Sequence, residues 1–110
     1  MALTQKEKQA LLRFRNRVKT SLGEPRVETR LFGSKARGDD SADSDLDVLV
    51  LVSSDDWKVR DKVCALAMDE LLDGGVLISP KAFSRRQWRQ LRRDGSPFVR
   101  NVMRDAVPIG

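Results

Sequence analysis

The sequence predicts a small α/β fold in which helices pack on a small mixed β-sheet. Segments with apolar residues at helical spacing alternate with short segments whose apolar pattern is typical of strands. Glycine or proline separates most of these segments. The chain has 110 residues, so residues 1–110 are expected to form a single domain. The predicted order is helix, strand, short helix, strand, helix, strand, helix and helix.

The first half of the chain has the clearest of these patterns. Thr4 and Glu7 have the spacing of a capping box, which predicts the start of the first helix. Residues 27–32 alternate between apolar and polar side chains and predict a strand. Residues 46–52 are apolar except for Asp47, which predicts a central strand that is buried on both faces.

The helix that follows is expected to begin at a cap formed by Ser54 or Asp55. Its apolar side predicts a core position for Cys64, which is the one cysteine of the chain. Asp69 and Glu70, near the end of the same helix, are expected to be solvated.

Three further elements are expected after this helix. A short strand is predicted over residues 76–79, because Pro80 cannot donate to a strand ladder. A second capping box begins at Ser84 and opens a helix, and Pro97 stands at the first position of one more helix. Residues 107–109 fit either a terminal strand or a loose tail.

Composition narrows the chemistry. The chain has no His, which excludes imidazole metal sites and Ser–His or Cys–His nucleophile pairs. A metal would therefore be bound by carboxylates, which favours Mg²⁺ or Mn²⁺. The sequence has no apolar run of membrane-spanning length, no apolar signal region at its N-terminus, and too few cysteines for an internal disulfide. These features predict a cytoplasmic protein without membrane association.

Charge is unevenly distributed along the chain, whose net charge is +5. Residues 81–104 hold eight basic side chains and one acidic one. Two interpretations of this basic segment stay open: a solvated helix surface, or a binding surface for an acidic partner or RNA. The few aromatic residues fall mostly at apolar-face positions, so no base-stacking platform is evident. Acidic residues gather earlier, over residues 37–47: Asp39, Asp40, Asp43, Asp45 and Asp47.

Candidate ligand-binding residues lie on both sides of this acidic segment. Asp45 and Asp47 project to the same side of the second strand, and two adjacent carboxylates repel each other unless a cation lies between them. A divalent metal there would also bind triphosphate oxygens. Gly33 lets the backbone approach a phosphate closely, and the Ser34 hydroxyl can donate to its oxygens. Arg37 could contact a phosphate bidentately. Taken singly, each feature is also compatible with an ordinary turn or surface.

Together these residues form one pattern: Gly33-Ser34, ten intervening residues, and Asp45-Leu46-Asp47. This pattern resembles the Gly-Ser-x10-Asp-x-Asp signature of the DNA polymerase beta-like nucleotidyltransferase superfamily, and the short length is similar to that of its minimal members. The resemblance implies the nucleotidyltransferase fold, with Gly33 and Ser34 binding the triphosphate and Asp45 and Asp47 binding Mg²⁺ or Mn²⁺. It also implies transfer of a nucleoside monophosphate to a hydroxyl group, with AMP from ATP as the expected case.

Minimal nucleotidyltransferases are often paired with a helical HEPN-type toxin, and some act as antitoxins by transferring AMP to a tyrosine of that partner. The resemblance therefore implies a HEPN-type protein partner as well as a nucleoside triphosphate. This chain has no Tyr, so an acceptor tyrosine would belong to another molecule.

Active members of the superfamily usually carry a third carboxylate on the following strand. Residues 76–79 include no acid, and Leu77 or Ser79 is expected to take the inward-facing position. We therefore expect slow or absent transfer by the isolated chain, unless an acid of the loop over residues 39–44 completes the site. The alternative to an enzyme is a nucleotide-binding or antitoxin module that acts by partner binding, and a basic RNA-binding protein ranks third.

Overall fold

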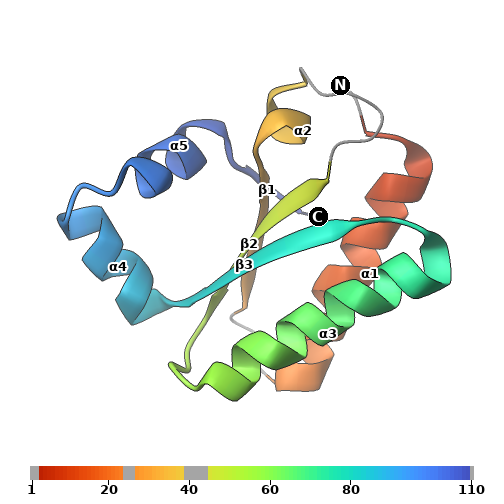
Figure 1. Ribbon diagram of the computed structural model, residues 1–110, viewed down its shortest axis with the longest axis horizontal. Helices are drawn as coiled ribbons and strands as arrows, with labels where there is room; N and C mark the ends of the chain where they lie inside the picture. The colour runs from red at the N-terminus through yellow and green to blue at the C-terminus, as the bar shows by residue number, and fades with distance from the viewer. Residues whose placement is uncertain (1–2, 24–26, 39–44, 110) are drawn as a thin grey trace.

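The computed structural model describes residues 3–23, 27–38 and 45–109. Within these ranges the chain forms four strands and five helices around one sheet (Figure 1). No helix in the described ranges is long and apolar enough to cross a membrane. The elements follow one another as α1 (Gln5–Leu22), β1 (Glu28–Phe32), α2 (Ser34–Arg37), β2 (Leu46–Val52), α3 (Trp57–Gly74), β3 (Ile78–Ser84), α4 (Arg85–Arg93), α5 (Pro97–Asp105) and β4 (Val107–Pro108).

The sheet is mixed, as the sequence predicts. Its strand order is β3-β2-β1-β4, in which β1 runs antiparallel to both β2 and β4, whereas β2 and β3 run parallel. The central strand β2 has the predicted bounds, and every residue in it except Asp47 is buried. The parallel register places Asp47 beside Ser79, so residues of β3 lie close to the candidate carboxylates.

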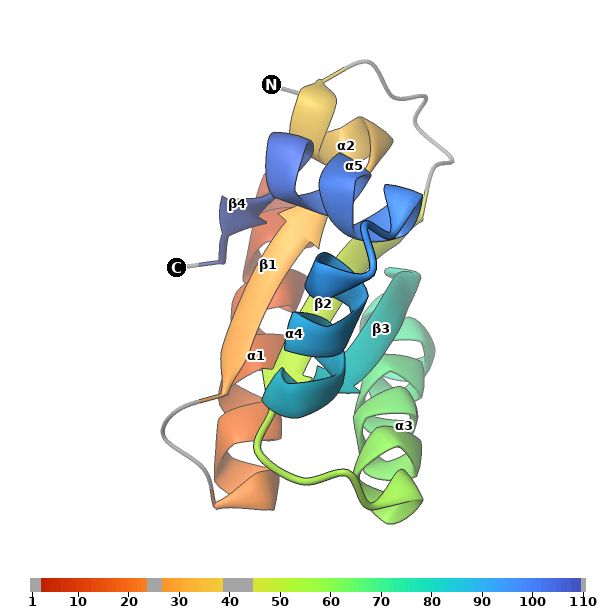
Figure 2. The same cartoon turned by 90° about the vertical axis from the view of Figure 1, so that its left-hand side faces the viewer.

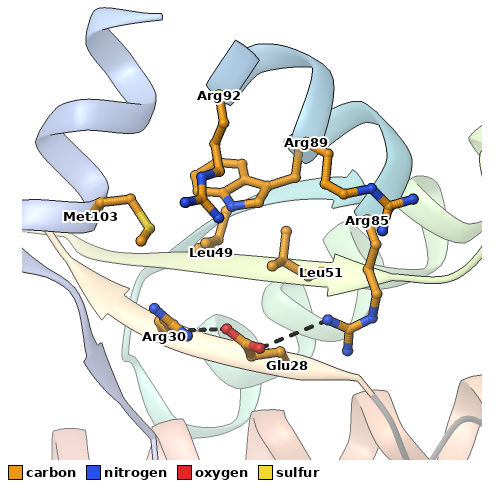
Figure 3. A pocket seen from close by; sticks show the side chains of 9 residues that line it. Glu28, Arg30, Leu49, Leu51, Arg85, Arg89, Arg92 and Met103 are labelled. Carbon is orange, nitrogen blue, oxygen red and sulfur yellow. Dashed lines mark ion pairs between the residues drawn. The ribbon is translucent and has the colours of Figure 1, made fainter. Parts of the chain in front are cut away.

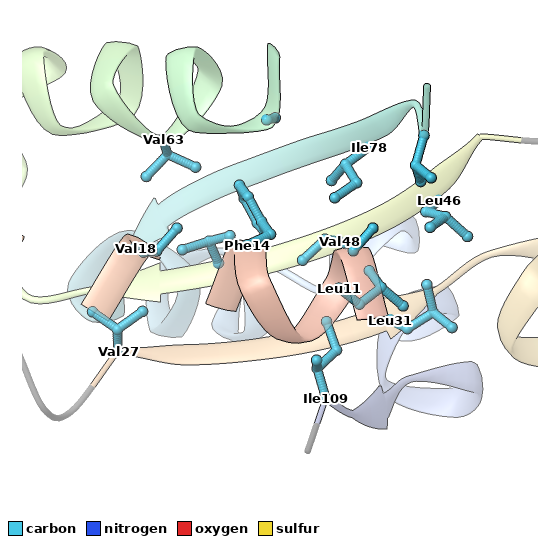
Figure 4. Packing of buried hydrophobic residues seen from close by; sticks show 14 of the residues in the cluster. Leu11, Phe14, Val18, Val27, Leu31, Leu46, Val48, Val63, Ile78 and Ile109 are labelled. Carbon is cyan, nitrogen blue, oxygen red and sulfur yellow. The ribbon is translucent and has the colours of Figure 1, made fainter. Parts of the chain in front are cut away.

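Different helices cover the two faces of the sheet (Figure 2). On one face, α1 and α3 enclose the main core, in which Phe14 and Val48 are fully buried (Figure 4). On the other face, α4 and α5 enclose a smaller core, in which Trp88 clusters with Leu49 and Leu51. β2 is therefore covered on both sides, as its nearly continuous apolar sequence predicts.

Most of the predicted start signals are confirmed. Thr4 and Ser84 each form both hydrogen bonds of a capping box, at the starts of α1 and α4. Ser96 caps α5, and Pro97 is its first residue. Of the two interpretations of residues 107–109, the strand is correct for Val107–Pro108.

The predicted cap of α3 is wrong by one or two residues. The cap is Asp56, whose side chain accepts a hydrogen bond of 3.0 Å from the backbone N–H of Lys58. The hydroxyl of Ser54 instead accepts from the backbone N–H of Asp56, which leaves Ser54 in the turn before the helix. Asp55 is drawn away by an ion pair with Arg86 of α4.

The predicted bounds of the third strand are also wrong. β3 begins at Ile78 and continues through Pro80 to Ser84. Proline fits because β3 pairs only with β2, so one side of its backbone needs no ladder donor. The longer strand includes Lys81, which the predicted strand of residues 76–79 left out.

Two side chains of α3 lie opposite to their predicted environment. Cys64 is exposed, because Val63 and not Cys64 stands on the side of α3 that enters the core. Glu70 is fully buried; it accepts a hydrogen bond of 3.0 Å from Arg13 and lies 3.3 Å from Arg17. These two guanidinium groups of α1 compensate the carboxylate where the two helices pack together.

Candidate nucleotide and metal site

The turn at Gly33 joins β1 to α2 and lies against the start of β2. Gly33 has a φ of 79°, which L-amino acids with a side chain rarely adopt. A Cβ atom at this position would lie 2.5 Å from Oδ2 of Asp47, so the absence of a side chain makes room for the carboxylate. Phe32 pairs with Asp47 across the antiparallel ladder and fixes the two segments together. The fold therefore brings the Gly-Ser turn and the second carboxylate into contact.

Asp45 and Asp47 differ in their surroundings. Asp45 is exposed, whereas Asp47 is half-buried and lies on the sheet face that α4 and α5 partly cover. Burial raises the pKa of Asp47; Lys81 opposes this shift and Asp45 adds to it. Within the described residues, neither carboxylate has a hydrogen bond or an ion pair. A half-buried carboxylate without a donor fits a hard divalent cation, which prefers oxygen ligands.

The strand beside Asp47 offers a hydroxyl and an ammonium group in place of a third carboxylate. Ser79 is the register partner of Asp47, and Lys81 stands two residues further along the same face. The Nζ atom of Lys81 donates to Oγ of Ser79 over 3.4 Å. Leu77 belongs to the same side of the chain but is 46% exposed, so Ser79 is the inward-facing one of the two predicted positions.

Ser34 and Arg37 stand at the two ends of α2. The hydroxyl of Ser34 makes no hydrogen bond to the described part of the chain. Arg37, which was expected to contact a phosphate, donates from Nη1 to Oδ2 of Asp105 over 3.2 Å. Hydrogen bonds lower the pKa of Asp105, first from Arg104 and then from Arg37. The guanidinium of Arg37 is thus tied to α5, although its side chain is still 42% exposed.

Sequence reasoning missed Lys35, which anchors the turn. Its side chain is 2% exposed and forms an ion pair of 3.1 Å with Glu7 of α1. Burial acts to raise the pKa of Glu7, but hydrogen bonds from Thr4 and Lys35 outweigh it and the pKa is lowered. Glu7 therefore serves both the capping box of α1 and the attachment of α2. The sequence gives no sign of this second partner, because Glu7 and Lys35 are far apart in the chain.

The acidic loop includes three of the predicted candidate ligands. Asp39, Asp40 and Asp43 lie outside the described residues, so their participation in the site stays a prediction. Among residues 3–23, 27–38 and 45–109, no group of three or more Asp, Glu, Cys or His side chains is arranged to hold a metal ion. The described chain thus offers two carboxylate ligands, Asp45 and Asp47.

Asp45 also borders a cavity of about 230 Å³ between α3 and β3. Ser79 contributes a polar group to its lining, but the remaining walls are mostly apolar and include Met68, Leu71 and Leu77. Met68 and Leu77 are 51% and 46% exposed, so the walls of the cavity are partly open to solvent. A group that entered this cavity would reach Asp45 through apolar surroundings.

Comparison with known proteins identifies the family. A family model described as "Nucleotidyltransferase domain" matches residues 11–102, which include the turn at Gly33 and both carboxylates. A search of curated proteins finds no match to the chain. The matched region covers most of the chain and runs from α1 into α5, and its mixed sheet with flanking helices is consistent with the fold of that family. The chain therefore belongs to the nucleotidyltransferase domain family, as a minimal member of the DNA polymerase beta-like superfamily.

Proposed function

We propose that the protein binds ATP together with Mg²⁺ or Mn²⁺ at Asp45 and Asp47 and transfers AMP to a hydroxyl group of another molecule. Nucleotidyl transfer is the reaction of the family, which generally uses a nucleoside triphosphate and a divalent metal. The observation that carries the proposal is the carboxylate of Asp47, which is half-buried, lacks a donor in the described chain and lies against Gly33.

Each residue of the site has a role in this proposal. The Gly33 backbone allows a phosphate to approach closely, and the Ser34 hydroxyl donates to a phosphate oxygen. Asp45 and Asp47 supply the oxygen ligands of the cation. A bound divalent cation would neutralise charge on the triphosphate during displacement of pyrophosphate from the α-phosphorus. Arg37 would reach a phosphate only after leaving Asp105.

The acceptor is proposed to be a hydroxyl group on a protein partner of the HEPN type, for which the chain would act as an antitoxin. The apolar cavity beside Asp45 supports a protein side chain over a charged acceptor, because Met68, Leu71 and Leu77 would surround it. The chain has no Tyr of its own, so modification of a tyrosine requires a second protein.

A second candidate function is nucleotide binding with little catalysis, so that the protein acts on its partner by contact. Ser79 and Lys81 favour this candidate, because they stand beside Asp47 where superfamily members usually place a third acid. A neutral hydroxyl accepts a proton poorly, and an ammonium group repels a second metal ion. Activation of the attacking hydroxyl would then depend on another acid.

Titration calorimetry with ATP tests the binding site. Affinity should be measurable with Mg²⁺ or Mn²⁺ and should fall below detection in excess chelator, because the cation links the triphosphate to Asp45 and Asp47. Equal affinity with and without chelator would contradict the proposed metal bridge. A matched measurement with GTP determines whether the site prefers adenine.

Labelled ATP, incubated with the protein and a candidate HEPN-type partner, separates the two candidate functions. Transfer is supported if the labelled AMP group appears on the partner and pyrophosphate is released. Metal-dependent ATP binding without label on any protein or RNA supports the binding module.

A further inference from the structure

A second cavity, which has charged walls, lies on the same sheet face as Asp47, between α4 and the strands β1 and β2 (Figure 3). Its volume is about 220 Å³. The bottom is apolar and includes Leu49 and Leu51 of β2, while Met103 of α5 closes one side. Four guanidinium groups surround it, from Arg30, Arg85, Arg89 and Arg92. The cavity shares no lining residue with the Gly33–Asp47 site.

The charges around this cavity are unbalanced. Among the described residues, Glu28 is the one acid in its lining, and it pairs with Arg30 and, at 3.8 Å, with Arg85. Arg89 and Arg92 have no ion pair or side-chain hydrogen bond within the described residues. Figure 3 shows Arg92 reaching from α4 toward Leu49. Four cations around one carboxylate favour an added anion, which relieves their repulsion and accepts bidentate hydrogen bonds.

Helix α4 places Arg86 on a different side from the arginines of the cavity. Arg85, Arg89 and Arg92 follow helical spacing and share one side of α4, which Arg93 extends. Arg86 stands on another side and is held by Asp55, with an Nη2–Oδ2 distance of 2.6 Å. Within the described residues, the lack of an ion pair at Arg89 and Arg92 is therefore not a general property of the basic sequence of α4.

The arrangement of the arginines suits an extended anion better than a compact one. A shallower hollow of about 330 Å³, lined by Arg89, Arg92 and Arg93, adjoins the cavity and shares two of its arginines. Successive turns of α4 space the guanidinium groups by about 6 Å along the helix axis, which matches a chain of repeated anions. A free phosphate or a mononucleotide would fill the first cavity and leave the second hollow open.

We propose that this row of arginines, with the cavity beneath it, binds the sugar–phosphate backbone of a single-stranded nucleic acid. Every basic group of the two linings is an arginine, whose planar fork matches phosphate oxygens in pairs. Among the residues that the structure describes, neither lining contains an amide or hydroxyl side chain that would read a base edge, so we expect binding that is independent of sequence. Arg30 pairs with Leu49, two residues from Asp47, so this edge of the cavity begins about 7 Å along the sheet from the backbone of Asp47.

Fluorescence anisotropy with a 5′-labelled oligouridylate of 15 nucleotides tests this proposal. The full chain is used, in the presence of a chelator and without ATP. Binding should weaken with salt at a slope near −2 on logarithmic axes, since about three phosphate contacts each contribute about 0.7. Arg89→Gln with Arg92→Gln should weaken binding at least about 10-fold and reduce the slope by about 1.4. Neither arginine has a described partner, so the variant should keep its melting temperature.

Matched variants distinguish this site from bulk charge and from the proposed transfer site. Lys8→Gln with Lys58→Gln removes the same charge from the exposed surfaces of α1 and α3 and should change affinity less than about 3-fold. Asp45→Asn with Asp47→Asn should not weaken oligouridylate binding, even if it abolishes ATP binding, and the loss of two nearby negative charges should favour it. Equal losses in the arginine and lysine variants would overturn the proposal, as would a salt slope shallower than −1. Competition by poly-glutamate as strong as that by unlabelled oligouridylate would also overturn it and assign the surface to an acidic protein.

Discussion

Charges of opposite sign lie beside the two ends of β2, on the same face of the sheet. At its start, Asp45 and Asp47 have no donor among the described residues. Towards its other end, Arg89 and Arg92 border the cavity over Leu51 and have no acceptor there. Elsewhere the chain pairs its buried charges, as in the buried ion pairs that hold α1 to α2 and to α3. These carboxylates and guanidinium groups lie at the two places where a ligand is proposed to bind.

An aromatic cluster keeps the two ends apart. Phe32, the register partner of Asp47, lies edge-on to Phe98 with ring centroids 5.8 Å apart. Phe98 contacts Trp88 at 6.3 Å, and Trp88 lines the arginine cavity. The aromatic rings therefore lie between Asp47 and the arginine cavity on this face. This separation leaves room on one small sheet for both the proposed cation site and the proposed anion site.

Removal of both carboxylates should have the largest effect. Asp45→Asn with Asp47→Asn should weaken Mg²⁺-dependent ATP binding at least about 100-fold, because the cation loses both described oxygen ligands. The melting temperature without metal should hold or rise, since the change removes mutual repulsion. Calorimetry and thermal melting measure the two effects. Asp61→Asn with Asp69→Asn, on the exposed side of α3, is the matched control. A large loss of stability would show instead that the carboxylates are structural acceptors.

A methyl group at Gly33 should have the next largest effect. Gly33→Ala combines an unfavourable φ with a Cβ that clashes with Oδ2 of Asp47, so it should cost about 2 kcal/mol of unfolding free energy or more. Gly38 has nearly the same φ of 78°, but its ψ of 11° is in the left-handed helical region, which a side chain tolerates better than the ψ of −159° at Gly33. Nothing lies within 4 Å of its Cβ position. Gly38→Ala should therefore cost only about 1 kcal/mol and keep ATP binding. Denaturant unfolding measures the costs, and equal values for both variants would contradict the contact between turn and carboxylate.

The sequence predicts the part of this comparison that rests on local patterns. The repeat of apolar side chains in β2, the capping boxes and the Gly-Ser turn depend on neighbouring residues, and the structure has them where predicted. The contact between Gly33 and Asp47 follows from antiparallel pairing of strands already predicted on either side of the motif.

Long-range partners are the part that could not be predicted. Lys35 reaches Glu7, and Glu70 is buried only because α1 supplies two arginines to it. The place of Lys81 in the third strand could not be predicted for a different reason. Pro80 predicts a strand end when the strand is taken as internal, and only the strand order reveals that β3 is an edge. The basic segment likewise gains a cavity only when α4 packs over β2.

An acid at the register position of Asp47 should sharpen the cation site. Ser79→Asp should raise nucleotidyl transfer about 10-fold over the unmodified chain, because it supplies a proton acceptor and a third ligand beside Asp47. Leu77 is exposed and lies two residues before Ser79, the register partner of Asp47, so Leu77→Asp should raise transfer less. Labelled ATP with the partner protein is the assay, and circular dichroism checks folding of both variants. Fast transfer by the unmodified chain alone would show that another acid, such as Asp39, Asp40 or Asp43, completes the site.

The smallest expected effect is the pH dependence of stability that Asp47 causes in the absence of metal. Burial raises the pKa of this carboxyl in the folded state above its ordinary value of 3.8, so the unfolded chain releases the proton first. The unmodified protein should therefore lose unfolding free energy relative to Asp47→Asn as pH rises through 3.8, and the difference should level off once the folded carboxyl has also ionised. Lys81→Met should enlarge this difference, because Lys81 lowers the pKa of Asp47, and Asp45→Asn should reduce it. Saturating Mg²⁺ should oppose the trend, since a bound cation favours the ionised carboxylate. Urea unfolding of the unmodified protein and the three variants between pH 3 and 7 measures these differences. If the metal-free unmodified protein instead gains stability with pH relative to Asp47→Asn, Asp47 has a hydrogen-bond donor in solution.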